Sequence, residues 1–204
     1  MLCFMKTMEK TVDEIRDQIL DAAFARFGQY GLGKTTMAEI AKDCDMSAGN
    51  LYRYYPNKAE IGAGCAMRCF NEMEALLREI MRRPNLTAAE RLKTFVLEKF
   101  YHVHEQFSEQ PKLYELVMYI QQEKFDMIQA LMKGQQSLLA EILAEGNRSG
   151  EFDVPDVLET ASLIQSAVTI FNAPHFINSY SFEKLEHDAK GVVDLLVRGL
   201  GKKN

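Results

Sequence analysis

The 204-residue sequence contains no tryptophan, five prolines and twelve glycines, so the residues that most often interrupt helices are scarce. It has no apolar run near the roughly 20 residues that a membrane-spanning helix needs, and its N-terminus lacks the extended apolar segment of a secretory signal. The four cysteines, Cys3, Cys44, Cys65 and Cys69, cannot form a disulfide framework for a chain of this length. These absences exclude membrane-spanning and disulfide-stapled classes, and they favour a helical protein in a reducing, cytoplasmic setting.

A basic domain is also missing. The net charge is −5, and the first 61 residues hold eight Lys/Arg against nine Asp/Glu. Nucleic-acid-binding domains are usually basic. Here the acidic residues concentrate in the predicted first helix, whereas Lys34, Arg53 and Lys58 flank the motif described next, and Lys6 and Lys10 lie in an N-terminal arm. The sequence therefore predicts positive charge at one site only.

Residues 35–61 predict two short helices joined by a tight turn. Thr36 and Glu39 have the spacing of a capping box, and apolar residues follow at helical intervals. Asp45 tolerates the left-handed conformation of a sharp turn, and Ser47 is a favoured N-cap for a second helix of about two turns. This pattern is a helix-turn-helix, whose second helix enters the major groove of DNA.

The second helix presents polar, aromatic and basic side chains, for which ordinary solvated surface residues are the alternative interpretation. Arg53 can pair bidentately with guanine, while Tyr, Ser and Thr hydroxyls usually reach phosphates. Gly49 leaves room for the groove, Lys58 starts the next helix beside the DNA backbone, and helix N-termini attract phosphate. The predicted DNA contacts are Thr35, Thr36, Ser47, Gly49, Asn50, Tyr52, Arg53, Tyr54 and Lys58.

The stretch from Ile15 to about Ile61 includes IRDQILDAAFARFGQYGLGKTTMAEIAKDC and SAGNLYRYYPNKAEI, and it resembles the tetracycline-repressor (TetR) family of bacterial transcription regulators. Asp45 and Tyr55 stand where that family usually has Gly and Phe. The resemblance implies an all-α homodimer with an N-terminal three-helix DNA-binding domain and a larger helical body. It implies that this body binds a small molecule and pairs through its last two helices. The family's residues that tend to touch DNA match Thr36, Gly49, Tyr52, Tyr54 and Lys58.

Periodicity and capping signals divide the chain into helices and two domains. No strand is predicted. We place a DNA-binding domain at residues 1–61 and a ligand-binding and dimerisation domain at residues 62–204. A loop is predicted at Gly146–Gly150 and a helix break near Ala173 and Pro174. The helices outside the motif are predicted at about 11–29, 57–82, 87–108, 111–120, 122–146, 155–171 and 181–200.

Aromatic and methionine side chains crowd the body, and together they suit an adaptable apolar cavity, although such a pattern is also typical of a core. The acidic, aromatic character of the body favours neutral or cationic lipophiles over anions. The residues predicted to line the cavity are Phe95, Tyr101, His104, Tyr114, Met118, Phe125, Phe171, Asn172 and His175.

Two other functions were considered, a sensor that uses cysteines and an enzyme. Cys65 and Cys69 are four residues apart on one helix face, a spacing that permits a redox or metal sensor, although small buried hydrophobic residues are the simpler interpretation. A helical enzyme would need a nucleophile elbow, a phosphate-binding glycine loop or a His-Glu-x-x-His motif, and none is present. We therefore expect a non-enzymatic repressor that a small lipophilic ligand releases from operator DNA. We expect it to use no cofactor, metal, catalytic residue or membrane partner.

Overall fold

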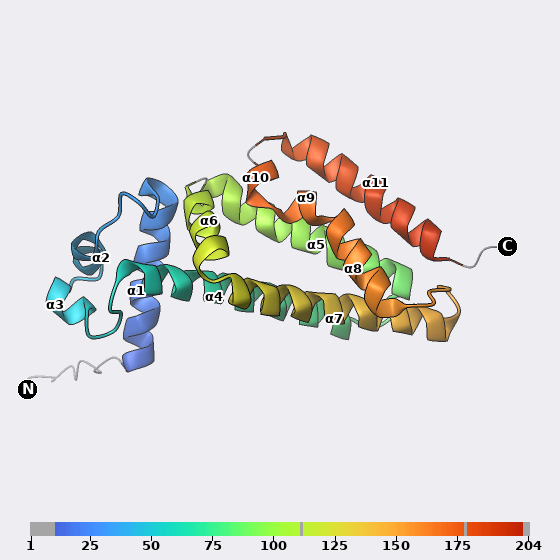
Figure 1. Cartoon of the computed structure of the whole chain (residues 1–204), viewed down its shortest axis with the longest axis horizontal. Coiled ribbons are helices and arrows are strands. Elements are labelled where there is room, and N and C mark those ends of the chain that lie inside the picture. The colour runs from blue at the N-terminus through green and yellow to red at the C-terminus, as the bar shows by residue number, and fades with distance from the viewer. Residues whose placement is uncertain (1–10, 111, 178, 202–204) are drawn as a thin grey trace, which may run out of the picture.

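The computed structural model describes residues 11–110, 112–177 and 179–201, and in these ranges every regular element is an α-helix, as predicted. Figure 1 shows α1–α3 gathered at one end of the molecule, here called the head, and α5–α11 forming an elongated body, with α4 joining the two. Among the described helices, none combines the length and the apolar character needed to cross a membrane. The helices are α1 (Val12–Tyr30), α2 (Met37–Asp43), α3 (Ala48–Leu51), α4 (Lys58–Arg82), α5 (Ala88–Glu109), α6 (Leu113–Glu123), α7 (Phe125–Ser149), α8 (Val157–Ala167), α9 (Thr169–Asn172), α10 (Pro174–Ile177) and α11 (Phe182–Leu200).

The capping signals of the head are confirmed. Thr36 and Glu39 form the reciprocal capping box that begins α2. The Ser47 hydroxyl accepts the backbone N–H of Asn50 and begins α3. Asp45 has a left-handed φ of 55° between the two helices, as the turn requires.

The turn between α2 and α3 is fastened to α1. The Gln18 side chain donates to the Cys44 carbonyl at 3.2 Å, and Cys44 itself is buried. The fully buried Phe27, Ile40 and Leu51 come from α1, α2 and α3 respectively and belong to the same core. The three short helices are therefore held in one fixed arrangement by apolar burial.

Helix α4 runs from the head into the body. Near its start Ile61 is fully buried, and near its end Leu77 and Ile80 are fully buried. The last carbonyls of a helix have no partner within the helix. Here the buried Arg91 guanidinium donates to the carbonyls of Ile80 and Met81, which satisfies them and fixes the turn into α5.

The predicted loop at Gly146–Gly150 is wrong. Helix α7 continues through Ser149 and ends at Gly150, whose φ of 80° is left-handed. Gly146 lies inside the helix, and the Phe152 ring occupies the position that a Cβ of residue 146 would take. Close packing therefore requires glycine here, and Gly146 is not part of the predicted turn.

The body differs from the prediction in two further places. The helix predicted at 155–171 is split at Val168 into α8 and α9, before the predicted break near Pro174. Helices α6 and α7 start at Lys112 and Lys124 without a side-chain cap, unlike α4, α5 and α11. Among the body's longer helices, α6 and α7 are thus the two whose first turns have no side-chain cap.

Candidate nucleic-acid interface and ligand cavity

The outer face of the helix-turn-helix carries most of the predicted DNA contacts. Helix α3 has four residues, fewer than the two turns predicted, because the chain turns after Tyr52 and approaches Pro56. Asn50 and Tyr54 are half-buried, and Tyr54 packs against the core. The predicted contacts that are exposed are Thr36, Ser47, Gly49, Tyr52 and Arg53.

No contact within the head requires glycine at position 49. A Cβ added there would meet nothing nearer than the Ser47 hydroxyl, at 4.0 Å. Glycine inside a helix costs about 1 kcal/mol relative to alanine. Glycine at this exposed position therefore lowers the stability of the helix, and no contact within the head compensates for the loss.

Arg26 neutralises the acidic residues of α2. Its Nε and Nη2 atoms donate to the two carboxylate oxygens of Asp43 at 2.6 and 3.0 Å, and Nη1 lies 3.4 Å from Glu39. These contacts lower the pKa of Asp43 through the side-chain hydrogen bond first and the charge of Arg26 second. Two carboxylates beside the candidate DNA surface are thus paired, which reduces the repulsion between the acidic head and DNA phosphates.

The structure gives Thr35 a role other than the predicted DNA contact. Its side chain is buried, and its hydroxyl donates to the Gly31 carbonyl at 2.9 Å. This hydrogen bond satisfies a backbone carbonyl at the C-cap of α1. Thr35 therefore shapes the loop between α1 and α2 from within.

Lys58 was expected at a phosphate, and its ammonium is bonded inside the head. It donates to the carbonyls of Leu32 and Thr35 at 2.6 and 2.7 Å, and to that of Gly33 at 3.4 Å. Charge-assisted hydrogen bonds of this kind are stronger than neutral ones. Lys58 therefore fastens the α1–α2 loop to the first turn of α4.

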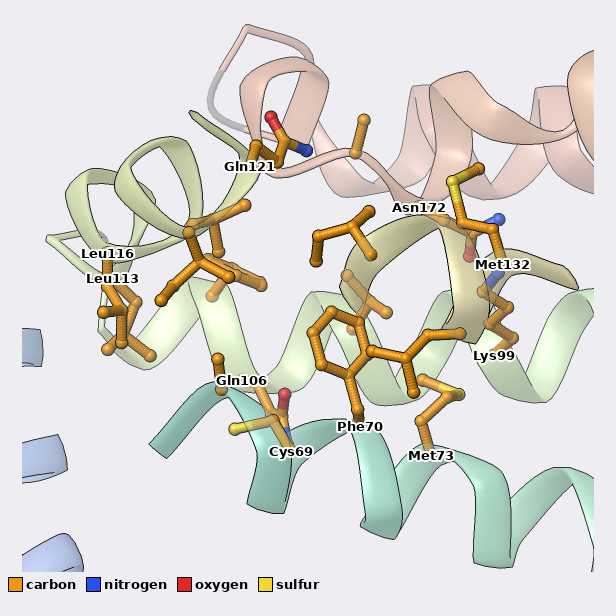
Figure 2. Close-up of a pocket in the computed structure, with 18 of the residues that line it drawn as sticks. Cys69, Phe70, Met73, Lys99, Gln106, Leu113, Leu116, Gln121, Met132 and Asn172 are labelled. Atoms are coloured by element: carbon orange, nitrogen blue, oxygen red, sulfur yellow. The ribbon is translucent and has the colours of Figure 1, made fainter. Parts of the chain in front are cut away.

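A cavity of about 250 Å³ lies between α4, α5, α6, α7 and the α8–α9 region. This is near the lower end of the roughly 300–1,000 Å³ typical of ligand sites. Figure 2 shows Phe70 and Met73 of α4 on one wall, with Leu113 and Leu116 at one end and Lys99 and Asn172 toward the other. Phe24 of α1 also contributes to the wall, so the head takes part directly in the cavity.

Among the described residues that were predicted to line a cavity, the structure places only Asn172 on this wall. Phe95 and Phe171 are buried in the core, whereas Met118 and Phe125 are 44% and 60% exposed. The other described residues face elsewhere or lie off the wall. Tyr101 donates to Glu186 of α11, His104 packs edge-on against Phe182 at 4.5 Å between ring centroids, and Tyr114 is half-buried on α6.

The side chain of His175, like Cys3 and the arm with Lys6 and Lys10, lies outside the described residues. The prediction chose large aromatic residues, which mostly fill the core or face solvent. It missed Lys99 and the glutamines of the cavity wall, for which helical periodicity gives no distinguishing signal.

The two cysteines on α4 are poor sensors. The Cys65 thiol is buried and donates to the Leu20 carbonyl at 3.6 Å. Burial raises the pKa of Cys65 to about 12 and that of Cys69 to about 11. The thiolate is the form that reacts or binds metal, so both thiols are unreactive near neutral pH. Within the described residues, no group of three His, Cys, Asp or Glu side chains is arranged to hold a metal ion.

Comparison with known families agrees with this architecture. Residues 88–193 match the family model described as the tetracyclin repressor-like C-terminal domain. Residues 19–63 match the model of bacterial regulatory proteins of the tetR family. The chain belongs to the TetR family.

Curated relatives of this TetR-family protein match part of its sequence. It is 33% identical over 76 residues to the probable acrEF/envCD operon repressor of Escherichia coli K12, covering 36% of this chain and 30% of that protein. It is 35% identical over 57 residues to the biofilm operon icaADBC HTH-type negative transcriptional regulator IcaR of Staphylococcus epidermidis, covering 28% and 31%. The chain thus matches about 30% of the length of these relatives.

Solved structures share the whole fold. A transcriptional regulator from Cytophaga hutchinsonii superposes with a TM-score of 0.74 at 22% identity, covering 91% of this chain and 98% of that one. SmeT, the repressor of the Stenotrophomonas maltophilia multidrug efflux pump SmeDEF, gives 0.70 at 19% identity and covers 93% and 91%. The SmeT–triclosan complex gives 0.70 at 18% identity and covers 93% of both chains.

Replacing Lys58 in this TetR-family head tests its internal role. Lys58→Ala should lower the free energy of unfolding by about 1–2 kcal/mol, because loop carbonyls lose charge-assisted hydrogen bonds. Lys42→Ala, which removes an exposed lysine of α2, should change it by less than about 0.5 kcal/mol. Urea titration followed by circular dichroism measures both values. Equal stability of the two variants would contradict the internal role of Lys58.

Proposed function

We propose that this TetR-family protein is a homodimeric repressor that binds operator DNA and is released by a small lipophilic ligand. It acts by binding and carries out no catalysis. We assign residues 1–61 to DNA reading and residues 62–204 to ligand binding and dimerisation. The observation that carries the proposal is that one short helix, α6, lines the cavity and also contacts the head.

The exposed face of α3 supports DNA reading. Arg53 is exposed on the turn after α3, where a guanidinium can reach base edges. The absent side chain of Gly49 leaves space that the head does not use, and a close DNA backbone or base would use it. The exposed Tyr52 offers a hydroxyl for phosphate. The Thr36 hydroxyl donates to the Glu39 carboxylate within the capping box.

Three contacts connect α6 and its flanking residues with the end of α1 and with the start of α4. The Glu115 carboxylate occupies the space where a Cβ of Gly31 would lie, and Leu116 lies 3.0 Å from the Cβ position of Gly62. Just after α6, Lys124 lies 3.2 Å from the Glu60 carboxylate in the first turn of α4.

The cavity side of α6 carries Leu113, Val117 and Ile120, and Leu116 belongs both to the cavity wall and to the contact with Gly62. A ligand that displaces α6 must therefore also displace the head, because these surfaces are in direct contact. A small rotation of the head changes the distance between the two recognition helices of a dimer. Each subunit reads one half-site, and these half-sites lie about 34–36 Å apart or a multiple of that distance.

The surface of α8 and α11 supports dimerisation through the last two long helices. Leu158 and Leu163 of α8 and Leu195 of α11 are each 63% exposed. Gly191, one turn before Leu195, has open space where a Cβ would be. Exposed apolar groups with small neighbours are typical of a self-complementary interface.

The release mechanism requires that ligand and operator weaken each other's binding equally. If a ligand weakens operator binding by some factor, operator must weaken ligand binding by the same factor. An operator is obtained by selecting bound fragments from a random DNA pool. Ligand titrations with and without that operator then test the mechanism, and equal ligand affinities in the two titrations would contradict it.

Arg53→Ala should reduce sequence discrimination. Loss of one base contact costs about 1–3 kcal/mol per half-site, and a dimer loses two. The difference in affinity between operator and scrambled duplex should therefore shrink. Equilibrium binding to both duplexes across a salt series measures it. If discrimination is unchanged, Arg53 contacts phosphate, and base reading falls to Asn50 or Tyr54.

Gly49→Ala should separate stability from DNA binding. Alanine is the better helix former, so the free energy of unfolding should stay level or rise by up to about 1 kcal/mol. Operator affinity should fall at least tenfold, since the methyl group enters the space that DNA would occupy. Ala38→Gly, the opposite change at an exposed position of α2, is the control for helix propensity. Unchanged operator affinity in Gly49→Ala would show that the groove does not approach this residue.

Leu163→Glu should produce monomers, because it places a charge in the proposed dimer interface. The chain mass of 23.3 kDa lets sedimentation velocity separate monomer from dimer. Phe125→Glu changes a residue that is equally exposed but lies at the start of α7, and it should leave the dimer intact. A dimeric Leu163→Glu variant would place the interface elsewhere.

A further inference from the structure

The cavity has one polar end, and Lys99 of α5 is at its centre. Its ammonium donates to the Gln135 side-chain oxygen of α7 at 2.5 Å. Lys99 is the one charged residue among the described residues of the cavity wall. Figure 2 shows it at the same end as Met132 and Asn172, away from Leu113 and Leu116.

No carboxylate compensates this charge. Among the described residues, the ion pairs do not include Lys99. Burial alone lowers the pKa of its ammonium to about 8, with no nearby charge acting on it. Lys99 is half-buried, and a cation that has lost part of its hydration is costly without a counter-ion unless something pairs with it.

A polar atom at this end lacks a partner. The Asn172 side-chain nitrogen donates to the Val168 carbonyl at 2.9 Å, but its oxygen is buried and accepts no hydrogen bond. Buried polar atoms are nearly always bonded. The Lys99 ammonium lacks a counter-ion and the Asn172 oxygen lacks a donor, so this end of the apolar cavity is suited to the polar group of a ligand.

We propose that the ligand is a lipophilic carboxylate whose acid group pairs with Lys99 and whose apolar tail extends toward Leu113 and Leu116 of α6. The Asn172 oxygen is an acceptor, as a carboxylate is, so the acid group bonds to Lys99 and not to that oxygen. This deepens the proposed function and rests on it for the effect on DNA. A neutral alcohol would leave the charge uncompensated, and an amine would add a second cation. The expectation of neutral or cationic ligands is therefore reversed. The acidic residues that suggested it do not lie on the cavity wall.

Three matched probes test the charge preference: decanoate, decanol and decylamine, titrated calorimetrically into the full-length dimer. Decanoate should bind roughly tenfold or more tightly than decanol, and decylamine weakest. Lys99→Met should weaken decanoate binding by roughly ten- to a hundredfold while leaving decanol within about threefold. Lys133→Met is the matched control, because Lys133 is an exposed lysine of α7 outside this cavity wall. It should behave as wild type.

Proton uptake gives an independent measurement. Near pH 8 part of the Lys99 population is deprotonated in the empty cavity, and a bound carboxylate favours the protonated form. Decanoate binding should therefore take up a fraction of a proton at pH 8 and almost none at pH 6, as seen in buffers of different ionisation enthalpy. The other described residues of the cavity wall carry no charge; they include Met73 on α4, Met132 and Gln135 on α7, Gln165 on α8 and Asn172 on α9. The Cys69 thiol, with its pKa raised to about 11, stays protonated. Lys99→Met should abolish the uptake.

Two outcomes overturn this inference: equal binding of the three probes, or decanoate binding that survives Lys99→Met unchanged. In either case, release of operator by any probe would still support the proposed function. Conversely, Lys99-dependent decanoate binding that leaves operator bound would confirm the carboxylate site and contradict ligand-controlled repression.

Discussion

The burial of α4 at both of its ends is the constraint on which the rest of the structure depends. Ile61 and Cys65 are enclosed by the head, and Leu77 and Ile80 are enclosed by the body. Because apolar burial is the main favourable contribution to folding, neither end can leave its core cheaply. The head therefore changes orientation only together with α4. The cavity opens onto the middle of the same helix at Met73, so whatever fills the cavity acts on the one element that both parts share.

Two cations in the body, the buried Arg91 and the half-buried Lys99, differ in what balances their charge. Arg91 donates to backbone carbonyls at the end of α4 and lies 3.3 Å from the Glu145 carboxylate. Its charge is balanced within the protein. Lys99 has a neutral amide as its partner, that of Gln135. Removing Arg91 would leave carbonyls unpaired, whereas Lys99 itself lacks a counter-ion, so the second arrangement is complete only when another molecule contributes one.

The features that sequence could predict are local. Thr36, Asp45 and Ser47 each determine the conformation of residues within four positions in the sequence. Their pattern therefore predicts the helix-turn-helix without knowledge of the tertiary structure. The starts of the capped helices α1, α4, α5 and α11 were predicted within about one residue for the same reason. The role of Gly146 was not predicted, because the Phe152 contact that requires a glycine depends on three-dimensional packing. The cavity was not predicted because its wall combines residues from α1 and from α4 to α9, and one sequence taken alone does not reveal which helix faces meet.

The missing side-chain caps at the starts of α6 and α7 have a consequence for how binding energy is used. The N–H groups of Leu113 and Glu115 donate to the backbone carbonyls of Gln110 and Lys112, and no side chain caps this end. A side-chain cap contributes about 0.5–2 kcal/mol to a helix, so α6 and α7 begin without a stabilising contact that α4 and α5 have. In the proposed mechanism, a ligand that moves α6 breaks no cap, and more of its binding energy remains for moving the head.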